Sequence, residues 1–274
     1  MIFQLALGMG LLIILLSFIF EYIDSSLGMG YGTSLTPILL LLGFNPLQVI
    51  PPVLFAQLFA GSFASIMHHY FGNANFNIKS KKKHKNDTWF IHFKKITSNN
   101  LKLAILISVG GTLGTLIAVL IAINISAFFL KLYIGILIIS MGVFILLTLN
   151  KKFKFSWTNV TLFSTLASFN KGLSGGGYGP IITGGQILSG VNTKNAVAIT
   201  TLAESLTCFI ALIIYLVIGA TIDWQIAPYL LIGGVLSAPI SAYTVKIIKT
   251  RKLSVAIALM AIAIGAMTLV RVIA

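Results

Sequence analysis

Residues 28–32 read GMGYG, and 147 positions later residues 175–179 read GGGYG. Shifting the chain on itself by 147 residues without gaps gives nine identities in the 29 positions from 28 to 56. The identical pairs beyond the strings include Thr36 with Thr183 and Asn45 with Asn192. This match indicates a duplication, in which each glycine string holds the same place in its own half of the chain.

The two strings lie in an unusually apolar chain. Its 274 residues are 57% hydrophobic and 9% charged, and the mean hydropathy is +1.00, which lies outside the range of soluble globular domains. A helix needs roughly 20 apolar residues to cross the hydrocarbon layer. Six runs are long enough, so we predict an all-α polytopic membrane protein with spans at 49–71, 103–123, 128–149, 196–218, 226–245 and 253–273.

The positive charge of the chain indicates how it lies in the membrane. The net charge is +14, and fifteen of the nineteen Lys and Arg residues lie in the loops 79–102, 151–154 and 246–252. Cytoplasmic loops accumulate these residues, so we expect a multi-pass protein of the cell membrane with all three loops cytoplasmic. The lipid bilayer is the expected partner. No nucleic-acid partner is expected, because membrane topology is the simpler explanation of the basic loops.

The second glycine string falls in a segment that cannot cross the membrane once. Two spans already lie between the second and third basic loops, so the segment 156–189 must begin and end on the same side. As a single helix its 34 residues would extend about 51 Å, which is too long for one span. We predict a re-entrant helical hairpin with GGGYG at its tip, buried in protein or lining a wet cavity.

Each half then consists of one glycine-tipped re-entrant hairpin and three transmembrane helices. Repeat 1 is residues 1–150, with its hairpin at 1–43, and repeat 2 is residues 151–274, with its hairpin at 156–189. Three crossings per half turn the second half over, so the halves are predicted to be inverted repeats within a single transmembrane domain. Whether residues 2–23 cross completely is left open.

The glycine pattern of the two halves resembles a known family. The first half fits the signature GxGxGxxxxPxLxxxG with Gly28, Gly30, Gly32, Pro37, Leu39 and Gly43. The second half fits it more loosely, with Gly184 in place of the proline and with Gly175, Gly176, Gly177, Gly179 and Gly190. The arrangement resembles the TauE/SafE family of sulfite and organosulfonate exporters. The resemblance implies outward transport of a small anion such as sulfite, sulfoacetate or a related organosulfonate.

Secondary transporters are often built from inverted repeats with broken helices, and they bind substrate near the middle of the membrane where the repeats meet. A short helix is expected to start after each string, and the two helix N-termini would direct N–H groups toward an anion between them. The alternatives are that the glycines only allow close packing and that the two tyrosines are core aromatics. The predicted substrate-binding residues are Gly28, Gly30, Tyr31, Gly32, Thr33, Ser34, Lys171, Gly175, Gly176, Gly177, Tyr178 and Gly179.

Ionisable residues within membrane segments are functional candidates. Asp24 and Lys171 occupy equivalent positions in the two repeats. They are expected either to pair or to act separately, with Asp24 taking up protons and Lys171 attracting the anion. Glu204 is expected to couple transport to protons or to serve as a structural hydrogen-bond acceptor, and Glu21 is the third candidate for ion coupling. His68 and the histidine after it are expected to be partly solvated at the end of their span.

Other functions have less support in the sequence. No cofactor, metal site, activated nucleophile or phosphate loop is recognisable, so the chain is not expected to be an enzyme. The rivals are a non-transporting scaffold or assembly factor and an ion channel. A filter made of GYG strings would need several copies in one orientation around an axis, which inverted halves do not provide. The coupling ion and the oligomeric state, a homodimer included, are left open.

Overall fold

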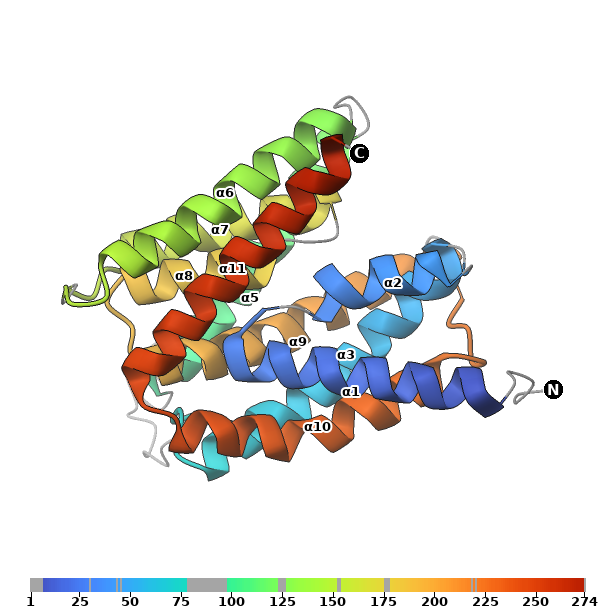
Figure 1. Cartoon of the computed structure of the whole chain (residues 1–274), viewed down its shortest axis with the longest axis horizontal. Coiled ribbons are helices and arrows are strands. Elements are labelled where there is room, and N and C mark those ends of the chain that lie inside the picture. The colour runs from blue at the N-terminus through green and yellow to red at the C-terminus, as the bar shows by residue number, and fades with distance from the viewer. Residues whose placement is uncertain are drawn as a thin grey trace, which may run out of the picture.

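The structure is a computed structural model that describes residues 7–29, 31–42, 44, 46–77, 98–122, 127–151, 154–174, 178–217, 219 and 221–273. Within these residues the protein is helical and contains no strand, which confirms the predicted all-α class. The helices are α1 (Leu7–Leu27), the π-helix η1 (Tyr31–Leu35), α2 (Thr36–Leu41), α3 (Pro46–Tyr70), α5 (Asn99–Ala122), α6 (Ala127–Leu147), α7 (Trp157–Ser174), α8 (Tyr178–Leu188), α9 (Thr193–Val217), α10 (Ala227–Ile247) and α11 (Thr250–Ile273) (Figure 1).

Each of the six predicted spans is helical, as α3, α5, α6, α9, α10 and α11. Five segments within the described residues are long and apolar enough to cross a membrane, and they lie at Leu7–Leu27, Gln48–Tyr70, Thr193–Val217, Ala227–Ile247 and Thr250–Met267. Leucine, isoleucine and phenylalanine side chains are exposed along their outer faces. Such faces suit contact with lipid tails, so the chain is a multi-pass membrane protein.

The first hairpin reverses at the first glycine string. Gly28 follows the last residue of α1 with a φ of 74°, a left-handed conformation that suits glycine. Its N–H donates to the carbonyl of Asp24 at 2.6 Å, which closes α1 with a left-handed cap. The chain then returns as η1 and α2 beside the first arm, toward the end of the molecule where the N-terminus lies (Figure 1).

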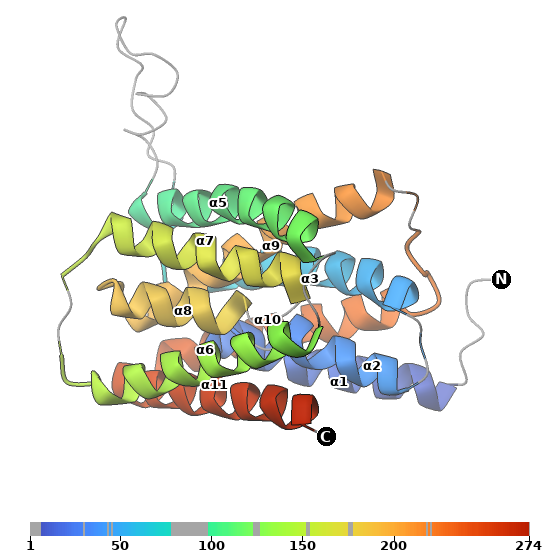
Figure 2. The ribbon, with the colours of Figure 1, turned by 90° about the horizontal axis from the view of Figure 1, so that it is seen from above.

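The second hairpin is formed by α7 and α8, which lie side by side (Figure 2). Its open end is closed by the N–H of Ser156, which donates to the carbonyl of Ser189 at 3.1 Å. A Schellman motif ends α8 at Gly190, where the N–H of Val191 donates to the carbonyl of Gln186 at 2.9 Å. The two hairpins open toward opposite ends of the molecule (Figure 2).

Each helix of the first half has a counterpart at the same place in the second half, and the packing contacts of a helix are repeated by its counterpart. Helix α1 packs on α10, and its counterpart α7 packs on α5, the counterpart of α10. The pairs α3 with α9 and α6 with α11 each consist of two counterparts. This pattern is what a two-fold relation between the halves requires, although the inverted repeat itself stays a prediction.

One junction between the halves is made at a glycine of α10. A Cβ atom at Gly234 would lie 2.8 Å from the Cβ of Ala60 on α3 and 3.8 Å from the Cγ of Glu21 on α1. Glycine is therefore required by space at this point, because α10 lies directly against both helices of the first half.

The corresponding junction is made at a glycine of α5. A Cβ atom at Gly111 would lie 3.0 Å from the Oγ of Ser168 on α7 and 3.0 Å from the Cγ2 of Thr207 on α9. These two residues stand 147 positions after the two that the α10 glycine meets. In each half, the same two positions thus pack against a glycine on a helix of the other half.

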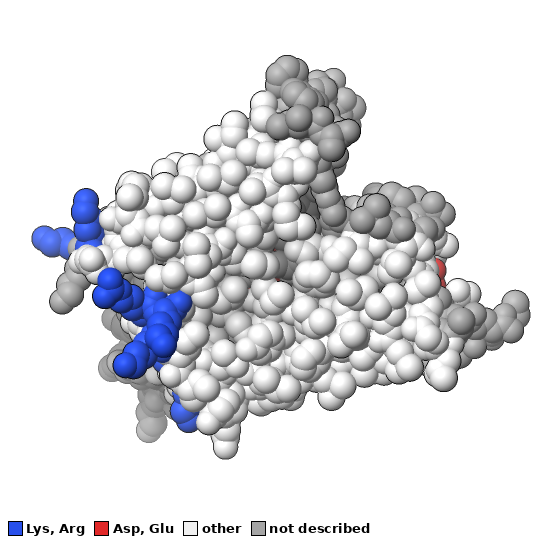
Figure 3. Space-filling model, viewed as in Figure 1, with Lys and Arg blue, Asp and Glu red and all other residues white. Residues whose placement is uncertain are grey.

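The basic residues of the described loops lie at one end of the molecule. Figure 3 shows Lys and Arg gathered at the end where α6 is followed by α7 and α10 is followed by α11. The predicted loops 151–154 and 246–252 lie at this end. Most of the predicted loop 79–102 lies outside the described residues. Helix α1 begins at the opposite end of the molecule, and α11 runs away from the basic end (Figure 2).

We predict that Gly111→Leu will destabilise the protein and that Gly110→Leu will not. The first substitution forces a side chain between α5, α7 and α9, and overpacking of this kind typically costs about 1–3 kcal/mol. The neighbouring glycine is a matched control, since a Cβ atom there meets nothing within 4 Å. The midpoint of thermal unfolding of the purified proteins in detergent measures both effects. Equal midpoints for the two variants would contradict the packing described for α5.

Candidate functional site

The two hairpins meet directly at residues of the glycine strings. The hydroxyl of Thr183 on α8 donates to the carbonyl of Gly28 at 2.9 Å, and a Cβ atom at Gly28 would collide with that hydroxyl. A Cβ atom at Gly179 would lie 2.5 Å from the same carbonyl and 2.7 Å from the Cα of Met29. Close approach of backbone to backbone therefore accounts for both glycines.

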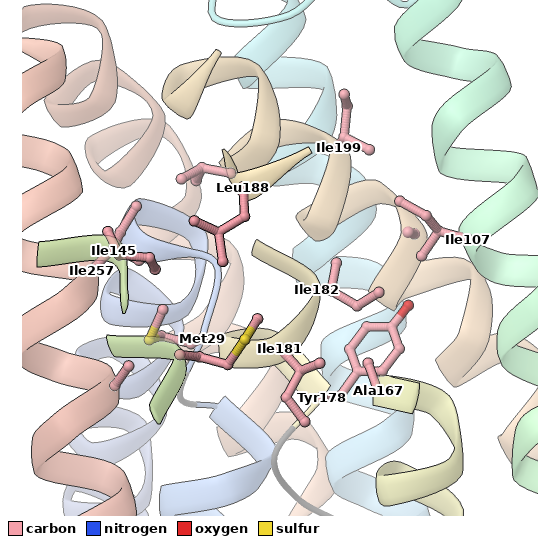
Figure 4. Packing of buried hydrophobic residues seen from close by; sticks show 14 of the residues in the cluster. Met29, Ile107, Ile145, Ala167, Tyr178, Ile181, Ile182, Leu188, Ile199 and Ile257 are labelled. Carbon is pink, nitrogen blue, oxygen red and sulfur yellow. The ribbon is translucent and has the colours of Figure 1, made fainter. Parts of the chain in front are cut away.

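The residue inside the first string is buried at this contact. Figure 4 shows the side chain of Met29 in the apolar cluster with Ile145 of α6, Ile181 of α8 and Ile257 of α11. The first tip thus packs among helices of both halves. The packing interpretation holds for Gly28 and Gly179 in this conformation, and the predicted anion site stays a prediction.

A short polar network continues from the contact into α9. The hydroxyl of Thr183 lies 3.0 Å from that of Thr200, and the side-chain amide of Gln186 donates to Thr200 at 2.8 Å. All three side chains are buried. Sequence reasoning missed this network, although Thr183 is one of the identities of the repeat, because Thr200 and Gln186 have apolar counterparts in the first half.

The carboxylate of Asp24 occupies the start of the returning arm of the first hairpin. It accepts the backbone N–H of Tyr31, the first residue of η1, at 3.3 Å. It also accepts the side-chain amide of Gln57 on α3 at 3.3 Å, and Gln57 in turn accepts the thiol of Cys208 on α9 at 3.3 Å. An N–H that a helix start leaves without a partner is therefore taken by a carboxylate of the protein itself.

The acidic residues predicted for ion coupling lie close together. Glu21 is fully buried, and both Asp24 and Glu204 are near enough for their charges to act on it. The hydroxyl of Ser25 donates to Oε1 of Glu21 at 2.6 Å. The structure thus brings together three carboxyl groups from α1 and α9 beside the first tip, an arrangement that the linear sequence does not show.

The two tyrosines of the glycine strings are both core residues. Tyr31 is fully buried, and its hydroxyl lies 3.0 Å from that of Ser17, which donates to the carbonyl of Leu230 on α10 at 2.6 Å. Tyr178 is buried near Ile182 and Ala167 (Figure 4). The core interpretation therefore describes their present contacts.

The expectation of partial solvation is wrong for His68, which is fully buried. Its Nε2 lies 2.9 Å from the carbonyl of Ser25, and its Nδ1 lies 3.0 Å from the side-chain amide of Asn73. That amide also donates to the carbonyl of Ala242 on α10 at 2.7 Å. Because the amide N–H donates to Nδ1 and the carbonyl accepts from Nε2, the ring is neutral with its proton on Nε2. His68 and Asn73 thus connect the end of α1 to α3 and α10.

The structure describes only some of the remaining predicted site residues. Gly32 and Ser34 are partly exposed. Gly30 and the residues Gly175, Gly176 and Gly177 lie outside the described residues, as do the side chains of Thr33 and Lys171. Across the described part of the chain, no group of three His, Cys, Asp or Glu residues is arranged to hold a metal ion.

Comparison with known proteins identifies one family. A family model described as Sulfite exporter TauE/SafE matches residues 88–268, which include α5 to α10, most of α11 and the second glycine string. The match agrees with the family that the glycine pattern resembles. No curated protein matches the chain significantly.

We predict that Thr183→Val will lower stability by about 1–3 kcal/mol, because it leaves the buried carbonyl of Gly28 without its donor. Valine has nearly the shape of threonine, so the change tests the hydroxyl and not the packing. Thr165→Val is the matched control, since that hydroxyl is exposed on α7 and bonds only within its own helix, to the carbonyl of Thr161. Chemical or thermal unfolding of both variants measures the difference. A loss no larger than the control's would show that the bond between the hairpins is dispensable.

Proposed function

The chain belongs to the sulfite exporter TauE/SafE family, and we propose that it is a secondary transporter that exports a small sulfur oxyanion or organosulfonate across the cell membrane. The family is one of membrane exporters, so transport of an anion is the activity the match supports. The observation that carries the proposal in the structure is the direct contact of the two glycine-tipped hairpins, Gly28 against Thr183 and Gly179.

We further propose that the two halves are inverted repeats. The exchange of helix pairs between the halves and the matching junctions at Gly111 and Gly234 support this relation. Transporters built in this way expose a site near the membrane middle to each side in turn. Because the hairpins touch at their tips here, passage of an anion between them requires the tips to separate.

The anion site is proposed at the two glycine strings, with the anion nearer the second. In the first hairpin, Asp24 accepts the N–H of Tyr31, so one anion is already present at that helix start. In the second hairpin, Lys171 stands at the position equivalent to Asp24, and Tyr178 is equivalent to Tyr31. A helix N-terminus beside a cationic residue attracts an oxyanion, whereas one beside a carboxylate repels it.

We also propose that the end of the molecule that carries the basic loops faces the cytoplasm. The gathering of Lys and Arg at that end supports this orientation. Single cysteines placed in a Cys208→Ser background at Lys151 and at Gln225 should separate the two sides. In intact cells, a membrane-impermeant maleimide should label the second and not the first. Labelling of the first cysteine and not the second would contradict the proposed orientation and indicate the opposite one.

Flux through the purified protein tests the proposed function. Proteoliposomes loaded with sulfite or sulfoacetate should release the anion faster than protein-free liposomes, and the rate should saturate with concentration. Absence of flux for every sulfur anion tested, with and without a pH gradient, would remove the proposal. A partner protein that stays bound through purification, together with no flux, would instead indicate a scaffold.

We predict that Lys171→Gln will weaken apparent anion affinity by tenfold or more, since tenfold corresponds to about 1.4 kcal/mol and charge-assisted hydrogen bonds are worth about 1.5–3 kcal/mol. Lys194→Gln is the matched control. Lys194 lies in the first turn of α9, at the basic end of the molecule. Its ammonium group donates to the carbonyl of Lys246 at 2.6 Å. Concentration dependence of flux measures both variants. Equal affinities would place the anion away from Lys171.

A further inference from the structure

Glu21 is buried in the first repeat with only part of its carboxyl group bonded. Its side chain has no exposed surface. The hydroxyl of Ser25 donates to Oε1, whereas Oε2 has no hydrogen-bond partner in the described part of the chain. An ionised carboxylate in such a place would lose its hydration without adequate replacement.

The groups around Glu21 do not supply a compensating positive charge among the described residues. Asp24 on the same helix and Glu204 on α9 are acids that act on it. Tyr31 on η1 bonds Ser17, and His68 on α3 is a neutral ring that reaches α1 through the carbonyl of Ser25. Helix α10 faces it with Gly234. With a buried Oε2 that has no partner among the described residues and with two further acids acting on it, the carboxyl group of Glu21 favours its neutral form.

The second repeat shows that packing alone does not demand an acid at this position. Ser168 is the counterpart of Glu21, and its Oγ lies 3.0 Å from a Cβ atom built at Gly111, where Glu21 meets Gly234. A serine thus fills the same junction in the other half. The carboxyl group of Glu21 is therefore an addition to the fold, set three residues before the acid that caps η1.

We propose that Glu21 holds a proton in this conformation and is the group that couples anion export to proton movement. The inference rests on the proposed function for its role in transport, but the protonated state stands on the surroundings of Glu21. When the hairpins separate and water reaches the junction, the Oε2–H bond breaks and the proton passes to water. The carboxylate regains a proton from water on the other side before it is buried again.

The last turn of α1 connects this proton to the first tip. Ser25 donates to Glu21 through its hydroxyl and accepts His68 through its carbonyl. Asp24 lies in the same turn and holds the first N–H of η1. Ionising Glu21 adds a negative charge beside Asp24 and so opposes the arrangement that closes the first tip. Loss of the proton therefore favours separation of the hairpins.

The protonated state can be tested without any substrate. We expect the infrared spectrum of the purified protein in detergent at neutral pH to contain the carbonyl band of a protonated carboxylic acid, shifted in heavy water. Glu21→Gln should remove that component, and Asp223→Asn, at a partly exposed acid outside the helices, should leave it. A wild-type spectrum without the band, or one that Glu21→Gln leaves unchanged, would overturn the proposal whatever the protein transports.

The coupling is tested by flux in proteoliposomes. For the wild type we expect an imposed pH gradient to change the rate of anion flux several-fold relative to the rate without a gradient. This ratio should fall to about 1 in Glu21→Gln and in Glu21→Ser, which installs the residue of the second repeat. Ser168→Ala is the matched control and should keep the wild-type ratio.

The two measurements separate the inference from the proposed function. Flux with a ratio near 1 in the wild type, or a ratio that both Glu21 variants keep, would overturn coupling through Glu21 while export itself stands. Flux that follows a sodium gradient and ignores the pH gradient would overturn it as well. If no sulfur anion moves, the proposed function fails, and the infrared band still decides whether Glu21 holds a proton.

Discussion

The interaction on which the structure depends is the bond from Thr183 to the carbonyl of Gly28. Both hairpins break their helices inside an apolar protein, and a broken helix exposes carbonyl and N–H groups that lipid cannot satisfy. Thr183 supplies a donor to one such carbonyl, and glycine at 28 and 179 lets the two backbones come close enough. Each hairpin therefore completes the other, and neither tip could be buried in this way alone.

The repeat places different chemistry in equivalent niches. Where the first half has an acid at 21, the second has Ser168, and where the first has Asp24, the second has Lys171. The shared residues, glycines and tyrosine, shape the hairpins, whereas the residues that differ carry charge. A perfectly symmetric pair of tips would present two equal helix starts to an anion. Under the proposed function, Asp24 already occupies one helix start and Lys171 makes the other attractive to an anion, so direction and coupling can both arise from one fold used twice.

The helices and the two hairpins could be predicted from the sequence because each rests on a long signal, an apolar run or a cluster of lysines. The contacts between helices could not, since they depend on which face of one helix meets another. His68 was misplaced for this reason: closeness to the end of α3 suggested solvent, but α1 and α10 cover it. The glycine pairs of α5 and α10 escaped notice because the basic loop changes their spacing to 123 residues, so the shift of 147 does not align them.

The chemistry of the hairpin contact suits a joint that opens. Among the described residues, the hydrogen bond that joins the tips is a neutral one, from Thr183 to the carbonyl of Gly28, and it lies beside the apolar packing of Met29. Such a bond contributes about 0.5–1.5 kcal/mol net. Charge at the first tip can compete on that scale, because Asp24 and Glu21 lie in the last two turns of α1. In the proposed mechanism, the acids on the first hairpin bind the proton and the lysine on the second hairpin attracts the anion. An event at either tip then shifts the same closed contact, which is the condition for coupling two ligands through one moving element.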